Sequence, residues 1–254
     1  MTLLACAARS ALVALVLLSG VLPARADDVK VLSSVAMRAV VEELAQRFER
    51  EGRHHVVTTF GLAAAMKSRI EAGEAFDLVI VTPAQIDDLI KQGKAAAASR
   101  AVIARTGLGL MVRAGSPKLD VGTVDAFKRT LLTAKSLTYV PAGASGVAFL
   151  ATAKQLGIAD ALAAKTKAGA SGEEVNANIT GGAAEIAVLP VSEILPVKGA
   201  TLGGVFPADV QTYIVMAGAT STTASPAARD FLALLTSAAS DAVITAKGME
   251  RVKP

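Results

Sequence analysis

The sequence has no tryptophan, one cysteine and two histidines, and only 4% of its residues are aromatic. The single cysteine, Cys6, lies in an N-terminal segment that we expect to be removed, so the remaining chain can form no disulfide, thiolate nucleophile or cysteine-ligated zinc site. His54 and His55 are adjacent and lack the spacing of a zinc-binding H-E-x-x-H motif. We interpret both histidines as solvated residues before a strand, and we expect no metal or cofactor.

Motifs for nucleophilic and nucleotide chemistry are also incomplete. The stretches around Ser145 and Ser171 resemble G-x-S-x-G but lack its final glycine. Gly93 and Lys94 lack the rest of a P-loop, and Gly107 with Gly109 lacks the rest of a dinucleotide fingerprint. Three acidic pairs, at 42–43, 87–88 and 173–174, fall in expected helices, where we interpret them as solvated. The missing catalytic constellation favours a binding protein over an enzyme.

The first 26 residues have the pattern of a secretory signal peptide. Arg9 precedes an apolar run from Ala11 to Leu22, which is shorter than the roughly 18 residues of a membrane span. Ala24-Arg25-Ala26 then forms an A-x-A cleavage site. We expect cleavage after Ala26 and export to the periplasm, with an uncleaved anchor as the alternative. Cleavage leaves 24 basic and 22 acidic residues, a balance without the clustered basic face that nucleic-acid binding requires.

The rest of the chain alternates strand-like and helix-like segments. For example, Val40, Leu44 and Phe48 repeat at helical spacing, and the apolar run 77–82 is typical of a buried parallel strand. Strands alternating with helices predict parallel βαβ units and an α/β fold. The expected strands are 29–33, 56–60, 77–82, 108–113, 137–140, 185–189 and 210–216, and the expected helices include 36–52, 62–72, 83–93, one capped by Thr123, one ending at Gly157, one capped by Ser171, and two opened by Ser225 and Ser240.

Three strand-to-helix turns, at 33–36, 58–64 and 141–146, are rich in small residues. In open α/β sheets, ligands bind beyond the carboxyl ends of strands, where helix N-termini present N–H groups and a partial positive charge. Small residues let the backbone approach a ligand closely, so we interpret the three turns together as an anion cradle. A tight connection is the simpler interpretation of any one turn taken alone. The candidate ligand-binding residues in these turns are Ser33, Ser34, Ala36, Thr59, Gly61, Ala63, Ser145 and Gly146.

At these residues the chain resembles the periplasmic molybdate-binding proteins, the type II solute-binding components of ABC importers. The resemblance covers nearly all of the chain after residue 26. It implies an α/β fold of two lobes, with mostly parallel sheets, flanking helices and two crossing strands. Lobe 1 would comprise residues 27–112 and 210–254, and lobe 2 residues 113–209. The segments that carry the resemblance are Val29-Lys-Val-Leu, Val56-Val-Thr-Thr-Phe60, Ile70-Glu-Ala-Gly73 followed by Asp77-Leu-Val-Ile-Val, and Gly143 to Gly157.

The resemblance also implies where ligand-binding residues stand, and here the chain departs from the family. The family's hydroxyl donors fall on Ala36, Ala63 and Leu189, and its two backbone donors fall on Ser145 and Val175. Each lost charge-assisted hydrogen bond contributes on the order of 1.5–3 kcal/mol, so three losses predict at least about a thousandfold weaker molybdate binding. Ser33, Ser34, Thr59 and Ser145 are alternative donors, and a small organic acid suits the apolar replacements better.

The sequence therefore predicts an exported solute-binding protein without a catalytic step. It would capture a small anion, an oxyanion or a small organic acid, in the cleft between its lobes and hand it to an inner-membrane ABC permease. We expect it to act as a monomer and to bind no nucleic acid. The alternative is an exported ligand sensor or accessory protein with no transport role.

Overall fold

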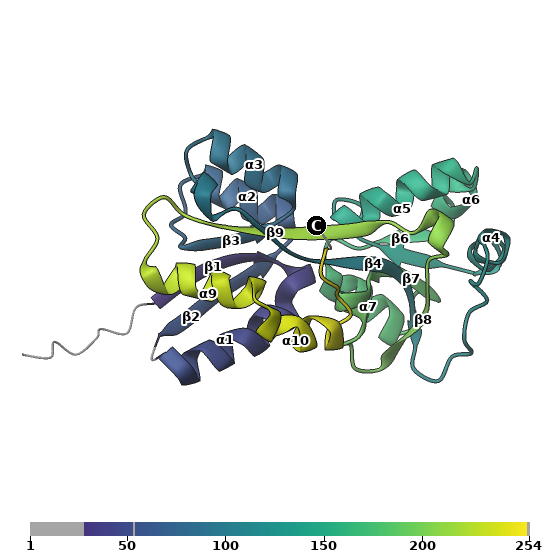
Figure 1. Ribbon diagram of the computed structural model, residues 1–254. Coiled ribbons are helices and arrows are strands. Elements are labelled where there is room, and N and C mark those ends of the chain that lie inside the picture. The colour runs from purple at the N-terminus through teal and green to yellow at the C-terminus, as the bar shows by residue number, and fades with distance from the viewer. Residues whose placement is uncertain (1–27, 53, 253–254) are drawn as a thin grey trace, which may run out of the picture.

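The computed structural model describes residues 28–52 and 54–252. The expected signal peptide and its cleavage site lie outside these residues. Figure 1 shows two lobes side by side, joined by two long strands that run through the middle of the molecule. Within the described ranges, no helix combines the length and the apolar character needed to cross a membrane.

The first lobe is a sheet with helices on both faces, as the alternating sequence pattern predicts. Its strands pair in parallel in the order β2-β1-β3. Helices α2 and α3 cover one face, and α1, α9 and α10 cover the other (Figure 1). Val40, Val41 and Leu44 of α1 are buried against the sheet, at the spacing that predicted this helix. The bounds are β1 (Asp28–Ser34), α1 (Arg38–Gly52), β2 (His55–Gly61), α2 (Ala63–Glu71), β3 (Leu78–Val81), α3 (Pro83–Lys91), α9 (Pro226–Thr236) and α10 (Asp241–Ala246).

The second lobe repeats this construction with shorter elements. Strands β7, β5 and β6 pair in parallel, with β5 in the middle. The predicted cap at Thr123 is confirmed, since its hydroxyl accepts a hydrogen bond from Ala126 N at 3.2 Å. The Ser171 hydroxyl likewise accepts from Glu174 N at 3.3 Å. The bounds are α4 (Val124–Thr133), β5 (Leu137–Tyr139), α5 (Ala144–Gln155), α6 (Ala159–Ala163), β6 (Thr166–Ala168), α7 (Gly172–Thr180), β7 (Ile186–Pro190), α8 (Val191–Ile194) and β8 (Ala200–Val205).

Two strands, β4 (Ala101–Arg113) and β9 (Tyr213–Thr220), connect the lobes. The first half of β4 pairs with β9, and from Leu108 onward β4 pairs instead with β7 and β8. Every antiparallel pair in the described sheets involves β4 or β9, whereas the βα units within each lobe pair in parallel. The α/β fold of two lobes with crossing strands is therefore confirmed.

Some strand boundaries differ from the sequence prediction. The expected strand 108–113 is only the second half of β4, because residues 101–107 mix small residues with Arg105 and Thr106 and do not form an apolar run. Strand β9 begins at Tyr213, since Val210 lies in a 3-10 turn. Strands β6 and β8 were not expected; β6 has three residues, and β8 contains two adjacent glycines.

The side chain of Gln211 braces the position where β4 changes partners. Its Oε1 accepts a hydrogen bond from Leu108 N at 2.8 Å, and its Nε2 donates to Leu108 O at 3.1 Å. Leu108 stands opposite Pro190 of β7, which has no N–H to offer the ladder. A Cβ on Gly107 would lie only 3.0 Å from Gln211 Nε2, so the glycine makes room for the brace. The amide thus supplies an acceptor for Leu108 N and a second donor to Leu108 O, which also accepts from Phe206 N.

We expect Gln211→Ala to destabilise the protein by about 1–3 kcal/mol, because it leaves the part-buried Leu108 N–H without its acceptor. Thermal unfolding should move down by roughly 2–4 °C per kcal/mol. Gln92→Ala is a matched control, since Gln92 makes an exposed side-chain bond to Glu71. Equal melting temperatures for the two variants would contradict the role of the brace.

Candidate functional site

A cavity of about 30 Å³ lies between the lobes, beside strand β9. That space holds about two water-sized groups, so the site suits one small head group rather than a large ligand. Its wall is formed mainly at the carboxyl ends of β1, β2, β5 and β7. The lining residues are Ser34, Val35, Ala36, Leu62, Ala63, Val140, Gly143, Ala144, Ser145, Gly172, Leu189, Pro190, Glu193, Ile214 and Met216.

Helices α2 and α5 begin at this cavity and have no side-chain cap, and neither has the four-residue α8. The N-cap residues are Leu62 for α2, in the first lobe, and Gly143 for α5, in the second, and neither donates or accepts a capping hydrogen bond through its side chain. Helices α4, α7 and α9 instead begin at capping hydroxyls. The first turn of an α-helix has N–H groups without intrahelical acceptors. The N-termini of α2 and α5 therefore keep free donors beside the cavity, one from each lobe.

Two hydroxyl groups supplement these backbone donors. Ser34 ends β1, and its Oγ accepts a hydrogen bond from Ala36 N at 3.4 Å, which leaves the hydroxyl hydrogen for another acceptor. Ser145 lies in the first turn of α5 and is buried. Ala36, Ala63 and Leu189 also line the cavity but contribute only apolar side chains. Of the ten candidate residues, these five line the cavity.

The other five candidates lie nearby without lining the cavity. Ser33 is fully buried, and its hydroxyl donates to Ser34 O at 3.1 Å. Thr59 pairs with Leu32 within the first sheet. The N–H of Val175 donates to Ser171 O at 3.1 Å as part of α7, and its side chain packs in the second-lobe core.

The two remaining candidates are glycines that permit close packing. A Cβ on Gly61 would lie 2.7 Å from Met66 Cε, and a Cβ on Gly146 would lie 2.0 Å from Val140 O. Gly146 therefore lets the first turn of α5 sit directly against the end of β5. These glycines affect the wall of the site indirectly, because they allow α2 to pack against the end of β2 and α5 to pack against the end of β5.

Sequence reasoning missed Glu193, the only ionisable residue among the described ones that line the cavity. Glu193 lies in the first turn of α8, directly after β7. Ligand sites form beyond the carboxyl ends of strands, so this position could have been identified as a candidate from the sequence. The turn after β7 has the sequence Pro-Val-Ser-Glu and lacks the small residues that marked the other turns. No described residue donates a hydrogen bond to the Glu193 carboxyl, whose Oε2 lies 3.3 Å from where a Cβ on Gly172 would stand.

The environment of Glu193 favours its neutral form. The residue as a whole is half-buried, but protein encloses its carboxyl group. Burial, reinforced by the negative charge of Glu173 and opposed by Arg38, raises the Glu193 pKa from 4.5 to about 7. Glu193 also borders a second cavity, of about 330 Å³, that extends between α1 and α7. Glu193 therefore borders both cavities, together with Val35 and Gly172.

Polar contacts across the cleft hold the lobes together at this site. Ser192 Oγ, in α8, donates to Ala36 O at 2.8 Å in the first lobe. Arg38 of α1 forms an ion pair with Glu173 of α7 at 3.5 Å. The residues Ser192, Arg38 and Glu173 line the same larger pocket as Glu193, so both contacts lie near it.

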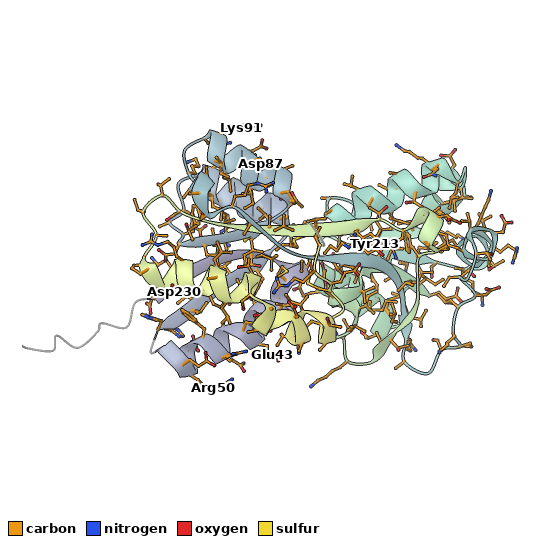
Figure 2. The ribbon with its side chains drawn as sticks, viewed as in Figure 1. Glu43, Arg50, Asp87, Lys91, Tyr213 and Asp230 are labelled. Atoms are coloured by element: carbon orange, nitrogen blue, oxygen red, sulfur yellow. The ribbon has the colours of Figure 1, made fainter. Side chains whose placement is uncertain are left out.

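The remaining polar candidates lie away from the cavity. His55 Nδ1 is 2.8 Å from Glu49 Oε1, and the His54 ring stacks on Phe48. Figure 2 labels Glu43 and Asp87, which pair with Lys247 at 2.7 Å and Arg100 at 2.6 Å respectively on the outside of the first lobe. In residues 28–52 and 54–252, no group of three or more His, Cys, Asp and Glu side chains could hold a metal ion.

The raised pKa of Glu193 predicts a pH-dependent contribution to stability. The folded protein keeps the proton to about pH 7, whereas the unfolded chain releases it near pH 4.5, so this contribution is full below pH 4.5 and is lost as the pH rises through 7. At 1.36 kcal/mol per pKa unit, discounted for partial exposure, it amounts to about 1–3 kcal/mol. We expect the melting temperature of the wild type to fall between pH 5 and 8 relative to Glu193→Gln.

The matched control for this measurement is Glu42→Gln, because Glu42 is an exposed glutamate near the same pocket. This variant should follow the wild-type pH profile. A wild type and a Glu193→Gln variant with parallel profiles would contradict the environment described for Glu193.

The family comparison agrees with this architecture. Residues 29–250 match the model of the bacterial extracellular solute-binding protein family. The chain is 28% identical over 200 residues to an aconitate isomerase from Pseudomonas sp, covering 74% of each protein. It is 29% identical over 178 residues to the molybdate-binding protein ModA of Azotobacter vinelandii, covering 67% of this chain and 68% of that protein.

The solved structures show the same fold. The periplasmic molybdate-binding protein of Azotobacter vinelandii superimposes with a TM-score of 0.74 and 20% identity, covering 89% of this chain and 99% of that one. The resemblance expected from the sequence is thus confirmed. With nearly its whole described length matching the family model, the chain belongs to the bacterial extracellular solute-binding protein family.

Proposed function

We propose that this protein captures a small organic anion through a carboxylate head group in the interlobe cleft, in the periplasm, and delivers it as a monomer to an inner-membrane ABC permease. The observation that carries the proposal is the pair of uncapped helix N-termini, α2 and α5, that open onto one cavity from opposite lobes. Helix N-termini stabilise anions through free N–H groups and the helix dipole. An anion bound by both would stabilise the closed arrangement of the lobes.

The composition of the wall supports an organic ligand over a bare oxyanion. Ala36, Ala63 and Leu189 offer methyl groups to the ligand, and only Ser34 and Ser145 offer hydroxyls. A tetrahedral dianion loses its hydration shell on entry and needs donors on every side. A carboxylate needs donors for two oxygens, and its carbon skeleton packs against apolar side chains. The neighbouring pocket of about 330 Å³ leaves room for such a skeleton.

The alternative is a sensor or accessory protein that binds the same kind of anion in the same cleft but does not take part in transport. Genes for a permease and an ATPase beside this gene would support transport. A receptor gene beside it, with no permease, would support sensing.

Isomerisation of an unsaturated carboxylate is a second candidate function. One relative is named aconitate isomerase, and Glu193 is a cavity residue whose pKa of about 7 suits proton transfer near neutral pH. Proton NMR of trans-aconitate incubated with the protein would detect the cis isomer. Turnover that Glu193→Gln abolishes would support an enzyme, and binding without turnover would support the solute-binding role alone.

A thermal-shift screen tests the ligand class. We expect citrate, trans-aconitate or another small carboxylate to raise the melting temperature by several degrees, since a ligand at 100 times its dissociation constant stabilises by about 2.7 kcal/mol. Millimolar molybdate, tungstate and sulfate should give much smaller shifts. Micromolar molybdate affinity in calorimetry would reject the organic-anion proposal in favour of an oxyanion carrier.

Adding hydroxyl groups to the wall tests the reason for this preference. We expect the double variant Ala36→Ser, Ala63→Ser to bind molybdate roughly a hundredfold tighter than the wild type, because each new charge-assisted bond contributes about 1.5–3 kcal/mol. Ala65→Ser is the control, since Ala65 is exposed in the same first turn of α2. A double variant that binds molybdate no better than the control would show that these positions do not contact the ligand.

A further inference from the structure

Glu193 presents an electrostatic conflict at the proposed anion site. In the part of the chain that the structure describes, it is the only ionisable residue that lines the small cavity, and no lysine, arginine or histidine lines it. An ionised carboxylate and an anionic head group within about 30 Å³ would repel each other strongly, because the surroundings are largely apolar. The cavity can therefore hold an anion only if this negative charge is compensated or removed.

The charged groups around Glu193 do not compensate it. Arg38 is the nearest cation that affects it, but Arg38 lies 3.5 Å from Glu173 and 3.9 Å from Glu42 and stacks over Phe60. Lys198 borders only the larger pocket and is exposed. Glu173, at the start of α7, adds a further negative charge. The groups that face Glu193 from α1, α7 and the segment after α8 thus leave its own charge unbalanced.

A neutral Glu193 would supply what the cavity lacks. A protonated carboxyl group carries one O–H donor, and two of the other lining side chains, Ser34 and Ser145, carry hydroxyls. No described residue donates a hydrogen bond to the Glu193 carboxyl, so only the charge of Arg38 favours its ionised form, against burial and Glu173. Burial and Glu173 raise its pKa to about 7, so the neutral form is populated at neutral pH.

We propose that Glu193 determines the specificity of the cleft by binding the anion as a neutral carboxylic acid, whose O–H donates a hydrogen bond to the anion. The ionised carboxylate takes up one proton from water when the anion binds, and it returns that proton when the anion leaves. This inference rests on the proposed anion-binding function. Anion capture by this protein is accordingly coupled to proton uptake.

Calorimetric titration with citrate and with trans-aconitate at pH 7, 8 and 9 tests the coupling. If only the protonated form binds, the affinity decreases by a factor that approaches ten for each pH unit above 7, or by roughly 30- to 100-fold across this range. The apparent binding enthalpy at pH 8 should change with the ionisation enthalpy of the buffer, as uptake of about one proton requires. Glu193→Gln keeps a donor without a titrating group, so its affinity should change less than about threefold.

Two further variants complete the test. Glu173→Gln removes a neighbouring negative charge but leaves Glu193 in place, so the pH slope should persist with its midpoint at lower pH. Glu193→Ala removes both the charge and the donor, so its affinity should be pH-independent and weaker than that of Glu193→Gln. Circular dichroism melts establish that each variant is folded at the titration temperature.

The outcomes separate this inference from the proposed function. If the wild type binds with an affinity that does not depend on pH, or if Glu193→Gln keeps the wild-type dependence of affinity on pH, the role of Glu193 is overturned while the anion-binding function stands. If neither citrate nor trans-aconitate binds at any pH, the proposed function fails and this inference fails with it. If a small cation such as choline binds to the wild type but not to Glu193→Gln, Glu193 acts as a fixed negative charge and the proposal is overturned.

Discussion

The continuous pairing of β4 across both lobes is the constraint on which the rest of the structure depends. One strand of 13 residues gives its first half to one sheet and its second half to the other. The carboxyl ends of the parallel strands in the two lobes therefore meet at one cleft, beside the crossing strands. Gln211 completes the hydrogen bonding at Leu108, where the partner changes. Without that shared strand, α2 and α5 would begin at separate surfaces and form no common cavity.

The site has few polar side chains because its donors come from the backbone. Elsewhere in the fold Thr123, Ser171 and Ser225 cap their helices, which stabilises each by on the order of 1 kcal/mol. Leu62 and Gly143 provide no such cap. Helices α2 and α5 thus lack a stabilising contact that a bound anion could replace. Under the proposed function, this local cost would couple ligand binding to closure of the lobes.

Periodicity and turn chemistry predicted most of the fold. Burial of α1 produces apolar residues at helical spacing, and the caps at Thr123 and Ser171 require hydroxyl side chains, so the sequence shows both directly. They did not predict the first half of β4 or strand β8, where pairing rather than an apolar run makes the strand. The small-residue turns located half of the site candidates at the cavity. Glu193 was missed, because its burial depends on α7 and α1 packing beside it, and no local pattern records such contacts.

The Glu193 carboxyl group could serve either a carrier or an isomerase, depending on its protonation state. A neutral acid that donates to a ligand oxygen holds that ligand without reacting, whereas a carboxylate beside a carbon-bound hydrogen can remove it. A pKa of about 7 makes both forms available to Glu193 near neutral pH. The atom of the ligand that faces Glu193 therefore decides between the two functions. If the small cavity holds the head group, as proposed, the skeleton would extend past Glu193 toward the larger pocket and bring both oxygen and carbon atoms within reach of its carboxyl group.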